Sequence, residues 1–208
     1  ASGLFFEFIP VHELGNKNPT RISLNEVQTG VNYLLILNSN AGLWGYNIGD
    51  TVEFVSINPY RIIVTGRVKH YISAFGEHVI GKEVDEAMQS TCREFGTRVV
   101  EFTVAPQVNP SEGGLPYHEW WIEFDEVPED LNRFSQFLDQ EMVKQNIYYD
   151  DLIQGAILRP LIIRPLRRDS FRTYMKTLGK LGGQNKVPRL SNDRKIVTEL
   201  ENLKVTIP

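Results

Sequence analysis

The chain changes character between Gly66 and Lys69. Before this point, short apolar runs separated by turn residues predict strands. After it, apolar residues at helical spacing begin to alternate with strands. The strands expected in the first part are Leu4–Ile9, Val31–Leu37, Thr51–Val55 and Tyr60–Val64. The switch predicts two bodies, residues 1–68 and residues 69–208, with a hinge at Lys69.

The second part alternates helices with strands, beginning with a helical pattern at Ile80–Glu94. Further helices are expected at Leu131–Gln145 and Ser170–Lys180, strands at Val99–Ala105, Tyr117–Asp125 and Pro160–Leu166, and a closing helix capped by Ser191. The expected fold class is therefore α+β, in which an antiparallel, half-barrel-like β segment precedes a small α+β domain.

Composition narrows the class of protein. No apolar run approaches the length of a membrane span, so we expect no membrane partner. The single cysteine, Cys92, excludes an internal disulfide and fits a cytoplasmic location. The four histidines show no metal-ligand spacing, so no metal site is expected within the chain.

Charge is distributed unevenly along the sequence. Residues 1–158 carry 10 Lys or Arg against 22 Asp or Glu, whereas residues 159–195 carry 11 basic and 2 acidic residues. Such a basic block indicates either a solvated face or a site for a polyanion, which could be nucleic acid or the phosphates of a nucleotide.

The stretch GYNIGD, Gly45–Asp50, precedes a strand, and Gly66-Arg67 follows the next one. By itself a Gly-Asp pair is typical of a β-turn in which the aspartate caps a backbone amide. A two-stranded hairpin, however, would bring Asp50 and Arg67 to one edge. There a carboxylate is suited to accept hydrogen bonds from two vicinal ribose hydroxyls, and the arginine to donate to ribose or phosphate oxygens.

Three motifs carry a resemblance to a known family. They are FFEFIPV at Phe5–Val11, NAGLWGYNIGD at Asn40–Asp50 and GGQNKVPR at Gly182–Arg189. With the spacing from Gly49-Asp50 to Gly66-Arg67, they resemble the auxin-responsive acyl-acid amido synthetases of the adenylate-forming superfamily, and bacterial members more than plant ones. One position departs from the plant pattern, because Asn47 stands where plant members usually carry an arginine.

The resemblance implies roles for individual residues. Asp50 would hold the ribose hydroxyls, Arg67 would contact ribose or phosphate, and Tyr46 and Gly49 would belong to the same nucleotide site. Lys69 would be the pivot between the end of a large N-terminal domain, at residues 1–68, and a mobile C-terminal cap at residues 69–208. The loop through Gly76 would face the active site in one of two domain orientations.

Two lysines compete for the catalytic position in this resemblance. The stretch MKTLGK points to Lys180, and the motif GGQNKVPR points to Lys186. We favour Lys186, because a glycine-rich loop suits a side chain that must reach an acyl phosphate and then withdraw. Lys180 would end a helix, where a lysine favours the helix dipole for structural reasons alone.

The activity implied is that of an ATP-dependent ligase, with ATP and Mg²⁺ as cofactors. It would adenylate a small carboxylic acid and transfer the acyl group to an amine, an amino acid being expected. No phosphate loop is found in the sequence, so we expect the N-terminal domain to be missing and the chain alone to be inactive. The alternatives are an acyl-CoA ligase and a non-catalytic nucleotide- or nucleic-acid-binding module using Arg159–Lys195. The leading hypothesis includes no nucleic acid.

Overall fold

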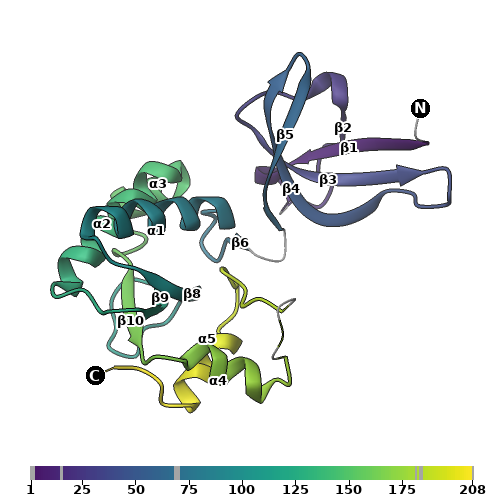
Figure 1. Cartoon of the computed structure of the whole chain (residues 1–208). Coiled ribbons are helices and arrows are strands. Elements are labelled where there is room, and N and C mark those ends of the chain that lie inside the picture. The colour runs from purple at the N-terminus through teal and green to yellow at the C-terminus, as the bar shows by residue number, and fades with distance from the viewer. Residues whose placement is uncertain (1–2, 15, 68–70, 181, 183–184, 208) are drawn as a thin grey trace. The chain divides into compact units, whose positions relative to one another are not determined.

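The computed structural model describes residues 3–14, 16–67, 71–180, 182 and 185–207. The chain forms two compact units, residues 1–69 and residues 70–208 (Figure 1). The expected hinge residue, Lys69, lies outside the described residues. The assignment of the two parts as the end of a large domain and a mobile cap stays a prediction. Among the described helices, none is long and apolar enough to cross a membrane.

The first unit is a five-stranded antiparallel sheet with the strand order β2-β1-β3-β4-β5. Its core forms where alternate residues of neighbouring strands meet on one face, with Phe8, Tyr33 and Phe54 packed edge to face. The strands are β1 (Leu4–Pro10), β2 (Ile22–Ser23), β3 (Asn32–Ser39), β4 (Tyr46–Ile57) and β5 (Tyr60–Arg67), with 3-10 turns at Val11–Glu13 and Leu24–Glu26.

The second unit is built on a three-stranded sheet with the order β10-β9-β8. Strands β8 (Val99–Gln107) and β9 (Tyr117–Phe124) are antiparallel, whereas β10 (Ile162–Leu166) runs parallel to β9. A short hairpin of β6 (Tyr71–Ile72) and β7 (Val79–Ile80) leads into the first helix. The helices are α1 (Gly81–Phe95), α2 (Leu131–Gln145), α3 (Ile147–Gln154), α4 (Ser170–Thr177) and α5 (Lys195–Asn202).

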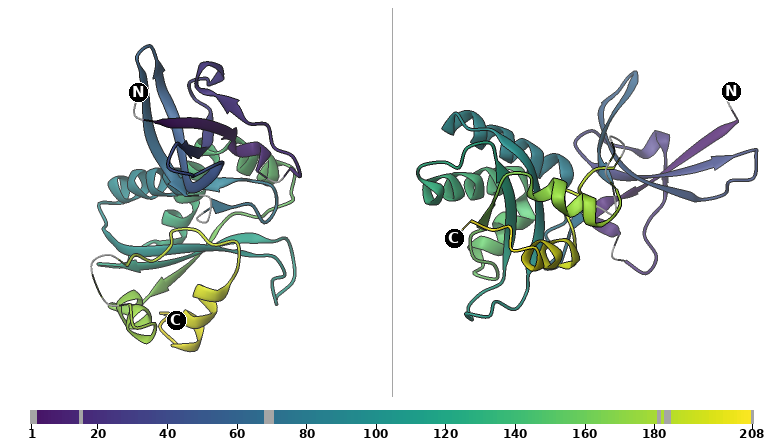
Figure 2. Two further views of the ribbon diagram at one scale, coloured as in Figure 1. Left: turned by 90° about the vertical axis from the view of Figure 1, so that its right-hand side faces the viewer. Right: turned by 60° about the horizontal axis from the view of Figure 1, so that its bottom comes forward.

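The sheet of the second unit is covered on both faces, by α1 and α2 on one and by α4 and α5 on the other (Figures 1 and 2). Strand β9 lies in the middle and is buried along its whole length. Trp120 and Ile122 pack into the cluster with α1 and α2, and Trp121 into the cluster with α4 and α5. The expected α+β fold class is confirmed, with an antiparallel β unit followed by a mixed α+β unit.

The closing helix begins later than the sequence predicts. Ser191 was expected to cap it, but α5 begins at Lys195 and its N-cap is Arg194. The backbone N–H of Ser191 instead donates to the carbonyl of Val104, 3.0 Å away on β8. Because this bond holds Ser191 at the edge of the sheet, the helix starts only after a further turn of chain.

Glu83 ties the start of α1 to the start of α3. Its Oε2 atom accepts hydrogen bonds from the backbone N–H of Ile80, at 2.9 Å, and from Nδ2 of Asn146, at 3.0 Å. Asn146 is itself the N-cap of α3, where its Oδ1 accepts from the N–H of Tyr149. Burial of the carboxyl group outweighs these two bonds and raises the pKa of Glu83 from 4.5 to about 7.

This raised pKa predicts a pH-dependent stability. Between pH 4.5 and about 7 the folded protein keeps a proton on Glu83 that the unfolded chain has released. The free energy of unfolding therefore falls as the pH rises through this window. In Glu83→Gln an uncharged amide oxygen can accept the same two bonds. We expect this variant to lose that fall and to gain about 1–3 kcal/mol above pH 7.

The measurement is urea denaturation at a series of pH values across that window. Glu94→Gln is the matched control, because it removes an exposed carboxylate from the same helix. If both variants change the pH profile equally, the effect belongs to net charge and the assignment to Glu83 is wrong.

Candidate functional site

The hairpin of β4 and β5 brings Asp50 and Arg67 together. The two residues are direct partners in the antiparallel register, and Nε of Arg67 donates to Oδ1 of Asp50 at 2.8 Å. The Arg67 side chain is 63% exposed and that of Asp50 is 23% exposed, so the pair lies at the surface with the carboxylate partly covered. The expectation that a hairpin carries both residues to one edge is confirmed. Their contact with a nucleotide stays a prediction.

The end of β4 that carries Asp50 is irregular. Against β3, Leu34 pairs with Thr51 but Ile36 pairs with Asn47, so three residues of β4 face one residue of β3. Gly49 lies inside this bulge with φ +84°, a left-handed conformation that glycine adopts without strain. The Asn47 Oδ1 atom accepts the backbone N–H of Gly49 at 2.8 Å. The strand was expected to begin at Thr51, but β4 already includes Tyr46 to Asp50, and the bulge supplies the bend.

A second bulge lies in the pairing of β4 with β5, next to the Asp50–Arg67 pair. On β5, Gly66 pairs with Thr51 and Val64 pairs with Val52, which leaves Thr65 as an extra residue. The buried Thr65 hydroxyl lies 2.9 Å from Oγ1 of Thr51 and 2.6 Å from Oδ1 of Asn32. Bulges of this kind re-aim the following side chains and are common beside binding sites. Thr65 therefore helps to set the direction in which Arg67 leaves the strand.

One carboxylate oxygen of Asp50 can still accept hydrogen bonds. Its Oδ2 atom accepts no hydrogen bond from any other residue in the described part of the chain. A carboxylate with one oxygen held by an arginine and the other open fits two adjacent hydroxyl groups. Tyr46, half exposed, and Gly49 lie on the same stretch of β4. Lys69 cannot be placed with them, because it lies outside the described residues.

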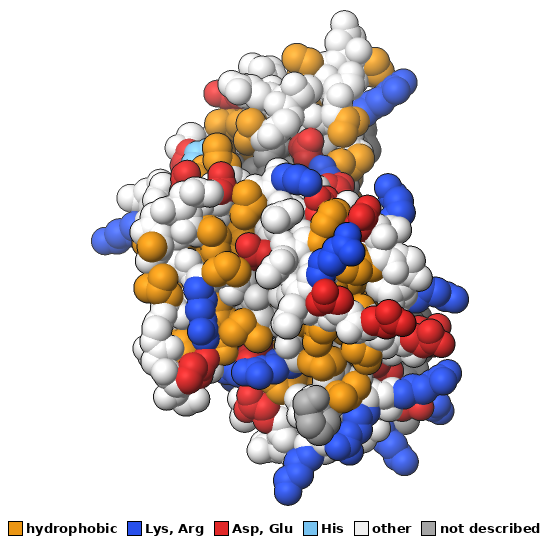
Figure 3. All heavy atoms as spheres, turned by 90° about the vertical axis from the view of Figure 1, so that its left-hand side faces the viewer, with side chains coloured by type: hydrophobic (Ala, Val, Ile, Leu, Met, Phe, Trp, Pro, Cys, Tyr) orange, Lys and Arg blue, Asp and Glu red, His pale blue; other side chains and the backbone are white. Residues whose placement is uncertain are grey.

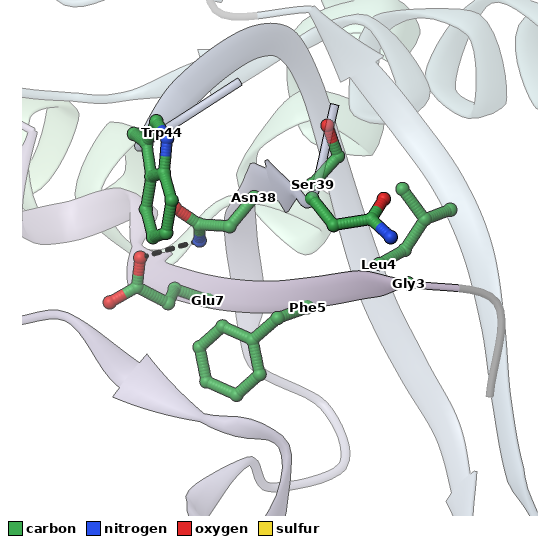
Figure 4. Close-up of a pocket in the computed structure, with 8 residues that line it drawn as sticks. Gly3, Leu4, Phe5, Glu7, Asn38, Ser39 and Trp44 are labelled. Carbon is green, nitrogen blue, oxygen red and sulfur yellow. Dashed lines mark hydrogen bonds between the residues drawn. The ribbon is translucent and has the colours of Figure 1, made fainter. Parts of the chain in front are cut away.

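A pocket of about 480 Å³ lies near the start of β4 (Figure 4). The Trp44 side chain, 80% exposed, stands beside the hydrogen bond that Nδ2 of Asn38 donates to Oε2 of Glu7. The lining residues are Gly3, Leu4, Phe5, Glu7, Asn38, Ser39, Asn40 and Trp44. Sequence reasoning missed this pocket, although its lining includes residues of the motifs FFEFIPV and NAGLWGYNIGD. An exposed tryptophan inside a motif was the available signal.

The two candidate lysines line one pocket of about 390 Å³ in the second unit. Lys186 is exposed and lies outside any helix or strand. Lys180 was expected to end a helix, but α4 ends at Thr177. Gly179 has φ +65°, and the N–H of Lys180 donates to the carbonyl of Met175, which closes the helix with a left-handed turn. Lys180 therefore follows the helix, and the two lysines compete within a single site.

Most of the basic block is engaged within the protein. Six of its eleven cations form ion pairs: Arg159, Arg164, Arg172, Arg189, Arg194 and Lys195. The remaining cations have no ion pair with another described residue, and three of these lie on or just after α4 (Lys176, Lys180 and Lys186). Lys and Arg side chains gather at the lower end of the face drawn in Figure 3. Charge density alone therefore overstates how much positive charge is available to a polyanion.

The described residues do not include a metal centre. Nowhere in the described ranges do three or more His, Cys, Asp or Glu side chains gather in a way that could hold a metal ion. His118, the most buried of the described histidines, is paired with Glu77, its Nε2 atom lying 2.8 Å from Oε1 of the carboxylate.

Comparison with known proteins gives the class of fold and then the family. The structure of the acyl acid amido synthetase GH3.15 superposes with a TM-score of 0.72 over 98% of this chain and 36% of that one, at 17% identity. This chain therefore shares the fold of about a third of that structure. Residues 1–67 match the GH3 family central domain and residues 82–195 match the GH3 family C-terminal domain. The chain belongs to the GH3 family.

Curated relatives agree with this family. Indole-3-acetic acid-amido synthetase GH3.3 of Arabidopsis thaliana is 26% identical over 89% of this chain, which corresponds to 33% of that protein. Indole-3-acetic acid-amido synthetase GH3.10 of the same plant is 26% identical over 91% of this chain and 35% of its own length. The chain thus spans about a third of these relatives. The family expected from the motifs is confirmed, and the nearer likeness to bacterial members stays a prediction.

The bulge in β4 yields a prediction about Gly49. No atom lies within 4 Å of a Cβ built at this position, so Gly49→Ala would be strained only by its φ of +84°. We expect this variant to lower the free energy of unfolding by about 1–2 kcal/mol. Gly81→Ala is the control, because its Cβ also meets open space but Gly81 has no left-handed φ. That change is expected to be neutral or stabilising by up to about 1 kcal/mol. Equal losses in urea denaturation would contradict the role of backbone conformation at Gly49.

Proposed function

We propose that this chain is part of an ATP-dependent ligase that adenylates a carboxylic acid and transfers the acyl group to an amine, an amino acid being the expected acceptor. The observation that carries the proposal is the pairing of Asp50 with Arg67 in a chain of the GH3 family. The names of its curated relatives, indole-3-acetic acid-amido synthetases, support a carboxylic acid as substrate and an amide as product.

The reaction would have two steps. A carboxylate oxygen attacks the α-phosphorus of ATP, and the bond to pyrophosphate breaks, which leaves an acyl adenylate. The amine nitrogen then attacks the acyl carbonyl carbon, AMP departs with the electron pair of the broken C–O bond, and the nitrogen loses a proton. The first step builds negative charge around phosphorus, where a positioned cation lowers the barrier.

Each site residue has a place in this scheme. Asp50 would accept hydrogen bonds from the two ribose hydroxyls, while Arg67 holds its other oxygen and faces ribose or phosphate. Tyr46 and Gly49 would border the nucleotide from the same stretch of β4. Lys186 would bring its ammonium group to the α-phosphate during adenylation. No step of this scheme is assigned to a metal ion.

The proposal extends to the rest of the protein. Because the chain spans about a third of its relatives, we propose that a further part supplies the phosphate loop and the acid pocket. These 208 residues alone would then be inactive. A cytoplasmic location fits the single cysteine. An acyl-CoA ligase would share the first step and differ in using a thiol, whereas the relatives' names favour an amine.

Asp50→Ala tests the nucleotide site in the whole protein. Loss of two charge-assisted hydrogen bonds to ribose, each worth about 1.5–3 kcal/mol, should raise the KM for ATP and slow adenylation. The measurement is ATP–pyrophosphate exchange at several ATP concentrations. Asp50→Asn keeps one acceptor oxygen and should fall between the wild type and Asp50→Ala. Unchanged exchange in a folded Asp50→Ala protein would remove Asp50 from the site.

A second prediction separates the two lysines that share a pocket. Lys186→Ala should lower acyl-adenylate formation by about 10²–10³, the range for losing one preorganised electrostatic donor. Transfer from a chemically supplied acyl adenylate should survive much better, since that step builds no charge on phosphorus. Lys180→Ala should leave both half-reactions close to the wild type. The reverse result, with the large adenylation defect in Lys180→Ala, would move the catalytic role to Lys180.

A further inference from the structure

The segment that carries Lys186 is fixed to the edge of β8 just beyond the lysine. The N–H of Val104 donates to the carbonyl of Arg189 at 2.9 Å, and the N–H of Ser191 donates to the carbonyl of Val104 at 3.0 Å. The hydroxyl of Thr103 donates to the carbonyl of Pro188 at 2.7 Å. Val187 and Leu190 are buried on opposite sides of the sheet. Lys186, by contrast, remains exposed.

Arg189 makes the charged contacts of this segment. Its Nε atom donates to Oδ1 of Asp85 on α1 at 3.1 Å, and Nη1 donates to the carbonyl of Phe102 at 3.2 Å. Nη1 also forms an ion pair with Oε1 of Glu101 on β8. The guanidinium lies over the Phe102 ring at 4.3 Å from its centre. Arg189 thus forms ion pairs with one carboxylate on α1 and one on β8.

One of these carboxylates borders the pocket of the lysine. Glu101 and Lys186 line the same cavity of about 390 Å³. Two further acids line this cavity: the buried Glu123, whose two oxygens accept the backbone N–H groups of Asp169 and Phe171 at 2.8 and 3.1 Å, and the exposed Asp169, which pairs with Arg172. Lys186 has no ion pair with another described residue. Glu101 also accepts the backbone N–H of Phe102 at 3.1 Å. Without Arg189, however, it would have no cationic partner among the described residues, in a cavity that the flexible lysine side chain also lines.

We propose that Arg189 is a positioning residue that keeps Lys186 available, by pairing with Glu101 and by holding the segment on β8 just beyond the lysine. This inference rests on the proposed role of Lys186 in adenylation. Val187 and Leu190 hold the segment down through apolar contacts, which are non-directional. The planar guanidinium of Arg189 adds directional hydrogen bonds, and it pairs with the Glu101 carboxylate, which would otherwise compete for Lys186.

The test uses the whole protein and three variants beside the wild type. Arg189→Met keeps an apolar stem over Phe102 but frees Glu101. We expect it to slow acyl-adenylate formation about three- to fivefold, the upper end of the range in which an exposed ion pair can withdraw a lysine. The double variant Arg189→Met/Glu101→Gln should recover to within about twofold of Glu101→Gln alone. Transfer from a supplied acyl adenylate should not change in any of them.

Two further readouts separate this role from a purely structural one. Added salt should relieve the defect of Arg189→Met more than it affects the wild type, because it screens a pair between Lys186 and Glu101. Asp85→Asn removes another contact of Arg189 but leaves Glu101 occupied. It should reduce the melting temperature while keeping adenylation near the wild-type rate. If Arg189→Met does not fold, Arg189→Lys serves instead, with a smaller defect that Glu101→Gln should also relieve.

The outcomes distinguish this inference from the proposed function. If Lys186→Ala leaves adenylation intact, the proposed role of Lys186 fails. If Lys186→Ala is defective, but Arg189→Met either matches the wild type or is not rescued by Glu101→Gln, the inference about Arg189 is overturned and the proposed function stands.

Discussion

The second unit depends on the burial of β9 with its ionisable side chains inside. His118 pairs with Glu77 from the loop before α1, and Glu119 accepts hydrogen bonds from Arg164, Arg194 and the Trp121 indole. Burial alone would raise the pKa of Glu119, but these three donors outweigh it and lower the pKa. A buried charge is tolerated only when it is paired in this way, so each polar residue of β9 fixes a different peripheral segment.

The loop through Gly76 is joined both to β9 and to the segment that carries Lys186. The loop through Gly76 is held to β9 by Glu77, whose carboxylate also accepts the N–H of Phe75 at 2.8 Å. At its other end, the N–H of Ser73 donates to Oδ1 of Asn192, just beyond the anchored part of the Lys186 segment. A displacement of either segment therefore strains bonds made by the other. The loop and the lysine segment are thus linked by a direct hydrogen bond.

The local sequence pattern predicts the helices and strands, but it does not predict the contacts between distant segments. Strands β3 and β9 and helix α2 could be predicted from apolar periodicity, and the pairing of Asp50 with Arg67 from the hairpin that joins their strands. The burial of Glu119 could not, because its arginine partners lie 45 and 75 residues away. Likewise, the bulge that draws Tyr46 to Asp50 into β4 depends on the Asn47 side chain and on pairing with β3. A short window of sequence contains neither the distant side chains nor the partner strand on which these features depend.

The arginines and lysines of the basic block differ in how they are engaged, and this difference leaves some of its cations without an ion pair among the described residues. Five of its six paired cations are arginines, whose planar fork suits fixed contacts such as those of Arg164 and Arg194 with Glu119. Lys180 and Lys186 keep flexible side chains and remain exposed. Asp50 is the opposite case, since it lies on a strand paired on both sides and is held by Arg67. A binding group gains from such preorganisation. A cation needed in only one of two steps gains from being unpaired, because an ion pair would have to break in every cycle.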